Sequence, residues 1–157
     1  MLDFGIDDII DEMVEEYRKK IKQAVKKAEV VARQRIENNI IPEIVGEYYG
    51  GYWPKYYWRQ YQLYKSVGPY SEFKESGNVF SLKLGVEDES PYGPDTMAHS
   101  GKTVDNSIIF SNFLSGIHPN VPTLHSDLQG TNTVEYANSL LEELIENELM
   151  PMIDNAI

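Results

Sequence analysis

Apolar residues recur every three or four positions along the first part of the chain, which is the period of one face of an α-helix. The series consists of Ile6, Ile10, Met13, Tyr17, Ile21, Ala24, Ala28, Val31, Ile36 and Ile40. Neither glycine nor proline interrupts it after Gly5, and Pro42 stands just beyond it. Because proline cannot donate a helical hydrogen bond, the pattern predicts a long helix over residues 1–41 that stops at Pro42.

A helix of about 35 residues would be roughly 50 Å long, which exceeds the roughly 30 Å width of a compact domain of this size. Two arrangements are open: the helix breaks near Asn38-Asn39 or bends around the core, or it projects from the domain. A projecting helix exposes part of its apolar stripe to water unless another chain covers it. The predicted length is therefore a first indication of assembly with other chains.

The rest of the chain contains fewer regular patterns. Alternating apolar and polar residues between Gly77 and Val86 predict a half-buried β-strand without an obvious partner. Residues 88–107 lack any periodicity and are predicted to form a long loop. The spacing of apolar residues predicts a short helix over Val104–Gly116 and a longer amphipathic helix over 131–155.

We expect Pro151 to bend or end that last helix. The chain shows no internal repeat. The length of 157 residues suits one domain. The order of elements predicts a single α+β domain over residues 1–157, in which the long N-terminal helix and the C-terminal amphipathic helix pack on a small antiparallel β-sheet.

Charge is distributed in blocks along the chain. Residues 1–16 carry seven acids and no base, residues 17–35 carry eight bases against Glu29 alone, and residues 103–157 carry eight acids and no base. The net charge of −11 argues against nucleic acid as a partner. We expect the basic segment 17–35 to face the acidic C-terminal helix, either within a subunit or between neighbouring subunits.

The residues that carry chemistry form no recognisable site. The chain has no cysteine, which excludes disulfides and thiolate nucleophiles. His118, His125 and Asp127 match no metal-binding spacing, and His99-Ser100 is an adjacency rather than a catalytic geometry. Ser100–Thr103 lacks the first glycine of a phosphate-binding loop. The sequence therefore predicts no enzymatic activity, no cofactor and no metal.

No apolar run approaches the roughly 20 residues that span a bilayer, so we expect no membrane segment. The first residues are acidic, whereas a secretory signal begins with basic ones. We therefore expect synthesis into the cytoplasm.

Aromatic residues are concentrated in a cluster over residues 48–64, which includes both tryptophans. Three interpretations are open: part of the core, a protein interface, or a surface that stacks nucleic acid or carbohydrate. The expected interface residues combine this cluster with acids of the last helix: Tyr52, Trp53, Tyr56, Tyr57, Trp58, Arg59, Glu142, Glu143 and Glu146. An alternative function is a small adaptor or nucleic-acid-binding module that uses the basic helix 17–35 and this cluster.

The order of these features resembles the small head-tail joining proteins of tailed phages and prophages, which are called minor capsid, neck or tail-completion proteins. The resemblance covers nearly the whole chain, and its most specific part is Tyr-x-Pro-x-Tyr-Tyr-x-Arg-x-x-x-Leu-x-x-Ser. That part corresponds to Tyr52, Pro54, Tyr56, Tyr57, Arg59, Leu63 and Ser66. The long charged helix, the strand, the helix that runs into a His-containing turn at 108–120 and the C-terminal helix complete it. Many phage versions have Thr at Gln60 and a lysine-rich last helix instead of an acidic one.

This resemblance implies a ring-forming α+β protein of the virion, made in the cytoplasm of the host bacterium. Its implied partners are further copies of itself and neighbouring virion proteins. Ring contacts are heterologous, so one face of each subunit must complement a different face of the next. Blocks of opposite charge on one chain suit such contacts. The resemblance implies no catalytic residues.

Overall fold

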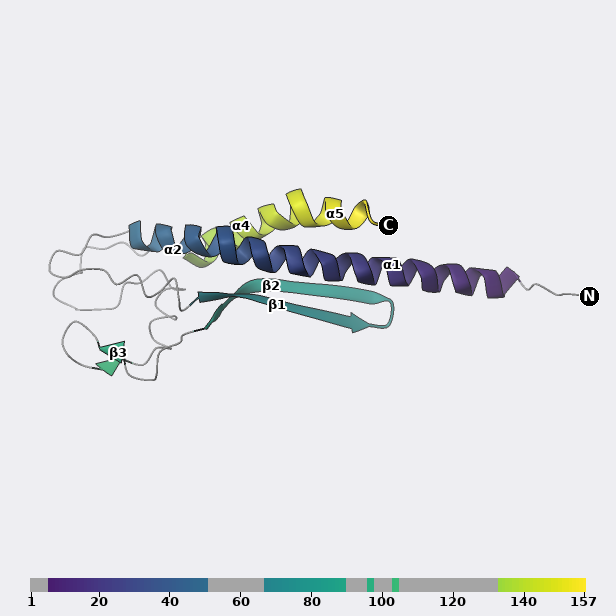
Figure 1. Ribbon diagram of the computed structural model, residues 1–157, viewed down its shortest axis with the longest axis horizontal. Coiled ribbons are helices and arrows are strands. Elements are labelled where there is room, and N and C mark those ends of the chain that lie inside the picture. Colours follow the sequence, from purple (N-terminus) through teal and green to yellow (C-terminus); the bar gives the residue numbers. More distant parts are fainter. Residues whose placement is uncertain (1–5, 51–66, 90–95, 98–102, 105–132) are drawn as a thin grey trace, which may run out of the picture.

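One continuous run of helical residues dominates the fold (Figure 1). The computed structural model describes residues 6–50, 67–89, 96–97, 103–104 and 133–157. Helix α1 (Ile6–Arg35) passes through a π-helical turn, η1 (Ile36–Ile40), into α2 (Ile41–Gly50). The run is roughly 65 Å long at 1.5 Å per residue. The prediction that Pro42 ends the helix is therefore wrong.

The π turn explains how Pro42 is accommodated within the helix. The N–H of Ile41 donates to the carbonyl of Ile36, five residues back, where an α-helix would use the residue four back. In a regular α-helix the ring of Pro42 would collide with the carbonyl of Asn38. A wider turn directly before the proline relieves that collision. The turn includes Asn38-Asn39, where a break had been one expectation, and the helix does not break there.

The C-terminal helix repeats this arrangement. It consists of α4 (Thr133–Leu144), a second π-helical turn η3 (Ile145–Leu149) and α5 (Met150–Asp154), and Met150 donates to the carbonyl of Ile145. The two turns share a motif, Ile-Glu-Asn-Asn-Ile-Ile-Pro at 36–42 and Ile-Glu-Asn-Glu-Leu-Met-Pro at 145–151. A similar local sequence therefore accompanies each π turn.

A second effect of the first π turn is to keep one stripe of the long helix facing the core. Every fourth residue from Ala24 to Tyr48 is buried: Ala24, Ala28, Ala32, Ile36, Ile40, Ile44 and Tyr48. In a straight α-helix such a stripe drifts by about 40° at each step, because four residues exceed one turn of 3.6. The wider turn reduces this drift where the stripe passes from α1 to α2.

A β-hairpin supplies the sheet. Strand β1 (Val67–Ser76) pairs antiparallel with β2 (Val79–Asp88). The two-residue connection contains Gly77 at φ 59°, a conformation that favours glycine. Along β2, Phe80, Leu82 and Leu84 are partly buried while Ser81 and Lys83 are exposed, so the predicted alternation is confirmed.

A second pair of strands, β3 (Thr96–Met97) and β4 (Thr103–Val104), lies within the segment that was predicted to be one long loop. Val104, the first residue of the predicted short helix, thus belongs to a strand. The rest of that predicted helix lies outside the described residues.

The long helix forms the middle layer of the fold, between the hairpin and the C-terminal helix (Figure 1). The C-terminal helix runs antiparallel to it, since Arg35 contacts Glu148 and Glu43 contacts Tyr136. The core gathers residues from all three layers: Ala28, Ala32, Ile36, Ile40, Ile41, Ile44, Val45, Tyr48, Val67, Ala137, Leu141, Leu144 and Leu149. The chain is therefore an α+β protein with long N-terminal and C-terminal helices and a small antiparallel sheet, as predicted.

Candidate protein interface

The tip of the hairpin is fastened to α1 by one carboxylate. Glu75 accepts hydrogen bonds from Arg18 at 2.7 Å and from Lys22 at 2.6 Å. Arg18 also donates to the carbonyl of Gly77 at 2.9 Å. The hydrogen bond from Lys22, together with the charges of Lys22 and Arg18, holds the pKa of Glu75 below its ordinary value. These contacts fix the tip of the hairpin against the middle of α1.

Nearer the base of the hairpin, Ser71 links two charged residues of α1. Its hydroxyl donates to Glu29 at 2.8 Å and accepts from Arg33 at 3.2 Å. Between this link and the tip, Phe73 and Phe80 stack with centroids 6.1 Å apart. Lys26 and Arg18 lie over these two rings at 5.7 and 5.9 Å. Much of the basic segment 17–35 is thus engaged by the hairpin.

Beyond the tip of the hairpin, α1 continues for several turns past both neighbouring layers (Figure 1). Large apolar side chains are exposed there: Ile9 is 49% exposed, Ile10 51%, Met13 65%, Val14 52% and Tyr17 53%. Ala24, further along the same stripe, is only 3% exposed. The described residues therefore cover this stripe from Ala24 onward and leave its N-terminal part open.

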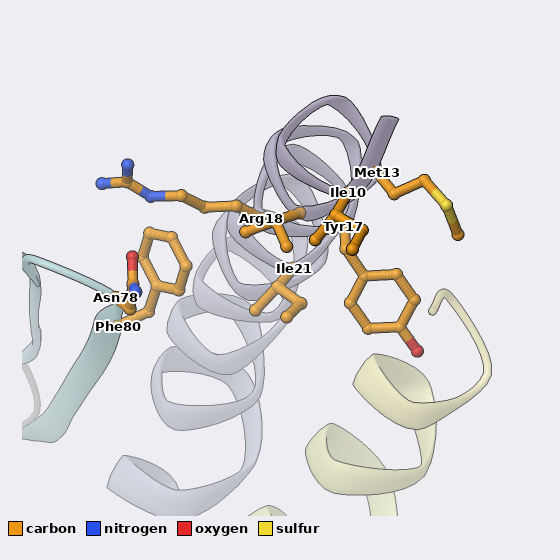
Figure 2. A pocket seen from close by; sticks show the side chains of 8 residues that line it. Ile10, Met13, Tyr17, Arg18, Ile21, Asn78 and Phe80 are labelled. Atoms are coloured by element: carbon orange, nitrogen blue, oxygen red, sulfur yellow. The ribbon is translucent and has the colours of Figure 1, made fainter. Parts of the chain in front are cut away.

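The open part of the stripe borders a hollow of about 470 Å³ (Figure 2). Its walls are Ile10, Met13, Val14, Tyr17, Arg18, Ile21, Asn78 and Phe80, of which the last two belong to the hairpin. In Figure 2 Arg18 extends toward the hairpin and Tyr17 toward the end of the C-terminal helix. An open, mostly apolar hollow on a projecting helix is typical of a surface that binds another protein. We call Ile10, Met13, Val14, Tyr17 and Ile21 the open stripe.

A charged groove of about 550 Å³ adjoins the open stripe. Acids and bases from α1 and the hairpin both line it: Glu12, Glu15, Glu16, Arg18, Lys19, Lys22 and Glu75. Within α1, Glu16 pairs with Lys20 at 3.2 Å. The place where the side-chain charges of α1 change from acidic to basic therefore lies beside the open stripe.

The acidic C-terminal helix meets the basic segment at one ion pair among the described residues. Arg35 donates to both oxygens of Glu148 at 3.0 Å. Glu142, Glu143 and Glu146, which the sequence singled out as interface residues, are exposed. The expected facing of charges within one subunit is thus limited to Arg35 and Glu148, and contacts of the three exposed glutamates with a neighbouring subunit stay a prediction.

Glu143 lies in a predominantly acidic environment. The hydroxyl of Tyr136 donates to Glu43 of α2. This hydrogen bond, with burial and the charges of Glu43, Glu47 and Glu143, raises the pKa of Tyr136. Acids of α2 and α4 therefore form one negative surface at this end of the molecule.

The other expected interface residues, Tyr52, Trp53, Tyr56, Tyr57, Trp58 and Arg59, lie outside the described residues, as do all three histidines. In the described segments no three His, Asp or Glu side chains are placed to hold a metal ion. The helical period of the sequence predicts the apolar face of α1 on which the open stripe lies. It does not show how much of that face the hairpin and the C-terminal helix cover.

Comparison with known proteins adds no identity: no protein-family model, no curated protein and no solved structure matches the chain. Among the described helices none is both long and apolar enough to cross a membrane.

Proposed function

We propose that this chain is a structural or assembly protein of a tailed phage or prophage virion. It joins head to tail or completes the tail through ring-forming contacts with copies of itself and with neighbouring virion proteins. The observation that carries the proposal is the open stripe on a helix that projects past the other layers. Such a surface is stabilised when another protein covers it.

Two further observations support a role in protein assembly. The chain has a long charged helix, a small sheet and a C-terminal amphipathic helix in that order, which is the order that the resemblance to joining proteins implies. The exposed glutamates of the C-terminal helix and the exposed lysines of α1 supply surfaces of opposite sign. Heterologous ring contacts need two such complementary surfaces.

A comparison of virions with and without this chain tests the proposal. Virions from a host that carries the gene should contain the chain, and antibody labelling should place it at the neck or at the tail. Deletion of the gene should yield unjoined heads and tails, or tails that are incomplete. Normal infectious particles after deletion, with no chain in wild-type virions, would contradict the proposal.

The alternative, a nucleic-acid-binding module, loses support from the contacts of the basic segment. Arg18 and Lys22 are engaged by Glu75, and Arg35 by Glu148. These cations are therefore less available to phosphate. A salt titration separates the two functions, because binding to phosphate weakens steeply with ionic strength and an apolar protein contact does not.

A further inference from the structure

We propose that the open stripe of α1 binds an amphipathic helix of a different protein, and that lysines or arginines flank the apolar face of that helix. Elsewhere in the described part of the chain, exposed large apolar side chains lie apart from one another, as at Val79 (64% exposed) and Val134 (45%). This inference deepens the proposed function, and it rests on that function for taking the partner to be another protein chain.

The packing of α1 further along the chain indicates that the occupant is a helix. From Ala24 onward the same face of α1 is buried, and the C-terminal helix is one of the elements that cover it. The helical residues of that element end at Asp154, and α1 continues past them (Figure 1). A second helix laid along the open stripe would continue this layer. The surface from Ile10 to Ile21 offers it about 17 Å, or three helical turns.

The hollow beside the stripe gives this helix a point of attachment. Its volume is about 470 Å³, and its walls come from both α1 and the hairpin. In Figure 2, Phe80 and Asn78 of the hairpin lie on one side of α1 and Tyr17 lies on the other, with Ile21 between them. A leucine or an aromatic residue of the partner would pack against these walls, as large side chains do at the centre of protein interfaces.

The charge beside the stripe selects a basic partner. Residues 7–16 of α1 contain six acids and no base. Glu16 is paired with Lys20 at 3.2 Å, whereas Asp11 forms no ion pair with a described residue. The helical period places Asp11 next to Val14, at the edge of the open stripe. A lysine or arginine beside the apolar face of the partner would therefore pair with Asp11.

The helices of this chain show the same matching of charge, and they argue against a second copy as the occupant. The acidic C-terminal helix packs on the basic part of α1, where Arg35 pairs with Glu148. The projecting part of α1 is acidic, so the matching helix is basic. Residues 103–157 contain no base, and the apolar stripe of α1 is already buried from Ala24 onward. The complement to the open stripe is therefore a helix of another protein.

Binding of defined helical peptides to the purified full-length chain tests the proposal. The probe is a dye-labelled peptide of about 14 residues, with leucines on one face and lysines along both edges of that face. A staple on the opposite face keeps it helical, because short helices are marginal in water. The comparison peptide carries glutamates in place of the lysines. By fluorescence anisotropy, we expect the lysine peptide to bind about tenfold more tightly than the glutamate peptide.

Single substitutions locate the bound peptide on the open stripe. Met13→Gln should weaken binding of the lysine peptide about tenfold, because an apolar contact is lost, and Ile10→Gln is a second variant of the same surface. Val30→Gln is the matched control, because Val30 is 58% exposed on the same helix but lies outside the stripe. Asp11→Asn should weaken binding about threefold, whereas Glu37→Gln, which removes an exposed acid elsewhere, should not. Circular dichroism checks that all variants fold.

A wild-type chain that binds neither peptide, or both equally, would overturn the proposal. Equal losses of affinity in Met13→Gln and Val30→Gln, or in Asp11→Asn and Glu37→Gln, would overturn it as well. A wild-type dimer in sedimentation that Met13→Gln dissociates would assign the stripe to a second copy instead.

The virion experiment separates this inference from the proposed function. Peptide binding by a chain that is absent from virions would contradict the proposed function alone. A chain that is found at the neck or tail and binds no peptide would contradict only the basic helical partner.

Discussion

Glu75 connects the two layers that meet at the middle of α1. Its carboxylate holds two cations of the helix, and its neighbours in the hairpin supply the aromatic rings beneath Arg18 and Lys26. The pattern of the sequence could not identify this contact, because Glu75 lies 57 and 53 positions from its partners. A glutamate in a charged segment is otherwise expected to face water.

Replacing this carboxylate should lower stability in a pH-dependent way. The pKa of Glu75 is lowered in the folded protein, so its contribution is present above the ordinary carboxyl pKa and is lost as the pH falls through the lowered value. We expect Glu75→Gln to melt below the wild type at neutral pH, with the difference vanishing in acid. Thermal unfolding between neutral and acidic pH measures this, and Glu12→Gln, which breaks no ion pair with a described residue, is the control.

The tip of the hairpin also requires glycine at position 77. Its φ of 59° is a conformation that side chains disfavour. Gly77→Ala should destabilise the protein by about 1 kcal/mol, because an L-residue is strained in the left-handed region. Gly85→Ala is the matched control in the same hairpin, since its added Cβ meets Tyr70 at an ordinary 3.8 Å. Equal urea midpoints for the two variants would contradict the requirement at Gly77.

At the level of elements, the long helix shows what periodicity can and cannot predict. The spacing of apolar residues predicted the helix and its face, because both follow from the 3.6-residue turn. It did not predict continuation through Pro42, because a local rule treats every interior proline as a stop. The signal that could have corrected it is the repeated Ile-Glu-Asn motif before each proline.

Deleting one residue from the first π turn tests its role in accommodating Pro42. Removal of exposed Asn39 should turn the π turn into an α turn, which keeps the following residues in phase but brings the ring of Pro42 against the carbonyl four residues back. We expect a loss of stability of about 3 kcal/mol, because that collision is the usual cost of a proline inside a regular α-helix. Asn39→Ala keeps the length of the turn and should have little effect. Denaturant unfolding followed by circular dichroism compares the two.

The first strand of the hairpin was missed for a different reason. In β1 the positions that face the helix include Ser71 and Glu75, which bond with charged residues of α1. The strand therefore lacks the apolar alternation that revealed β2. Its structure depends on contacts with a distant helix, and no local pattern could show them.

On the scale of the whole molecule, the sequence predicted the α+β class with its long N-terminal and C-terminal helices and a small antiparallel sheet. The blocks of charge also pointed to contacts between the basic and acidic segments. Within the described part of one subunit, the ionic contact between these two segments is the ion pair of Arg35 with Glu148. The candidate interface on α1 could not be located from sequence, because exposure depends on where the hairpin and the C-terminal helix end.

Reversing Glu142, Glu143 and Glu146 to Lys should weaken assembly while leaving the subunit folded. All three are exposed, and Glu143 lies among other acids near Tyr136, so reversal does not remove an attraction within the subunit. We expect a lower mass of any complex with neighbouring subunits and little change in melting temperature. The same mass as the wild type would show that these glutamates do not contribute to assembly.

The two π turns also have a consequence for how this sequence can change. A π turn is equivalent to one extra residue in an α-helix, and each here is followed by a proline. Losing the extra residue would restore an α turn, in which the proline that follows would meet the carbonyl four residues back. Each proline should therefore depend on the extra residue of its own turn: chains related to this one that lack the extra residue at 36–42 or at 145–151 should also lack the proline of that segment.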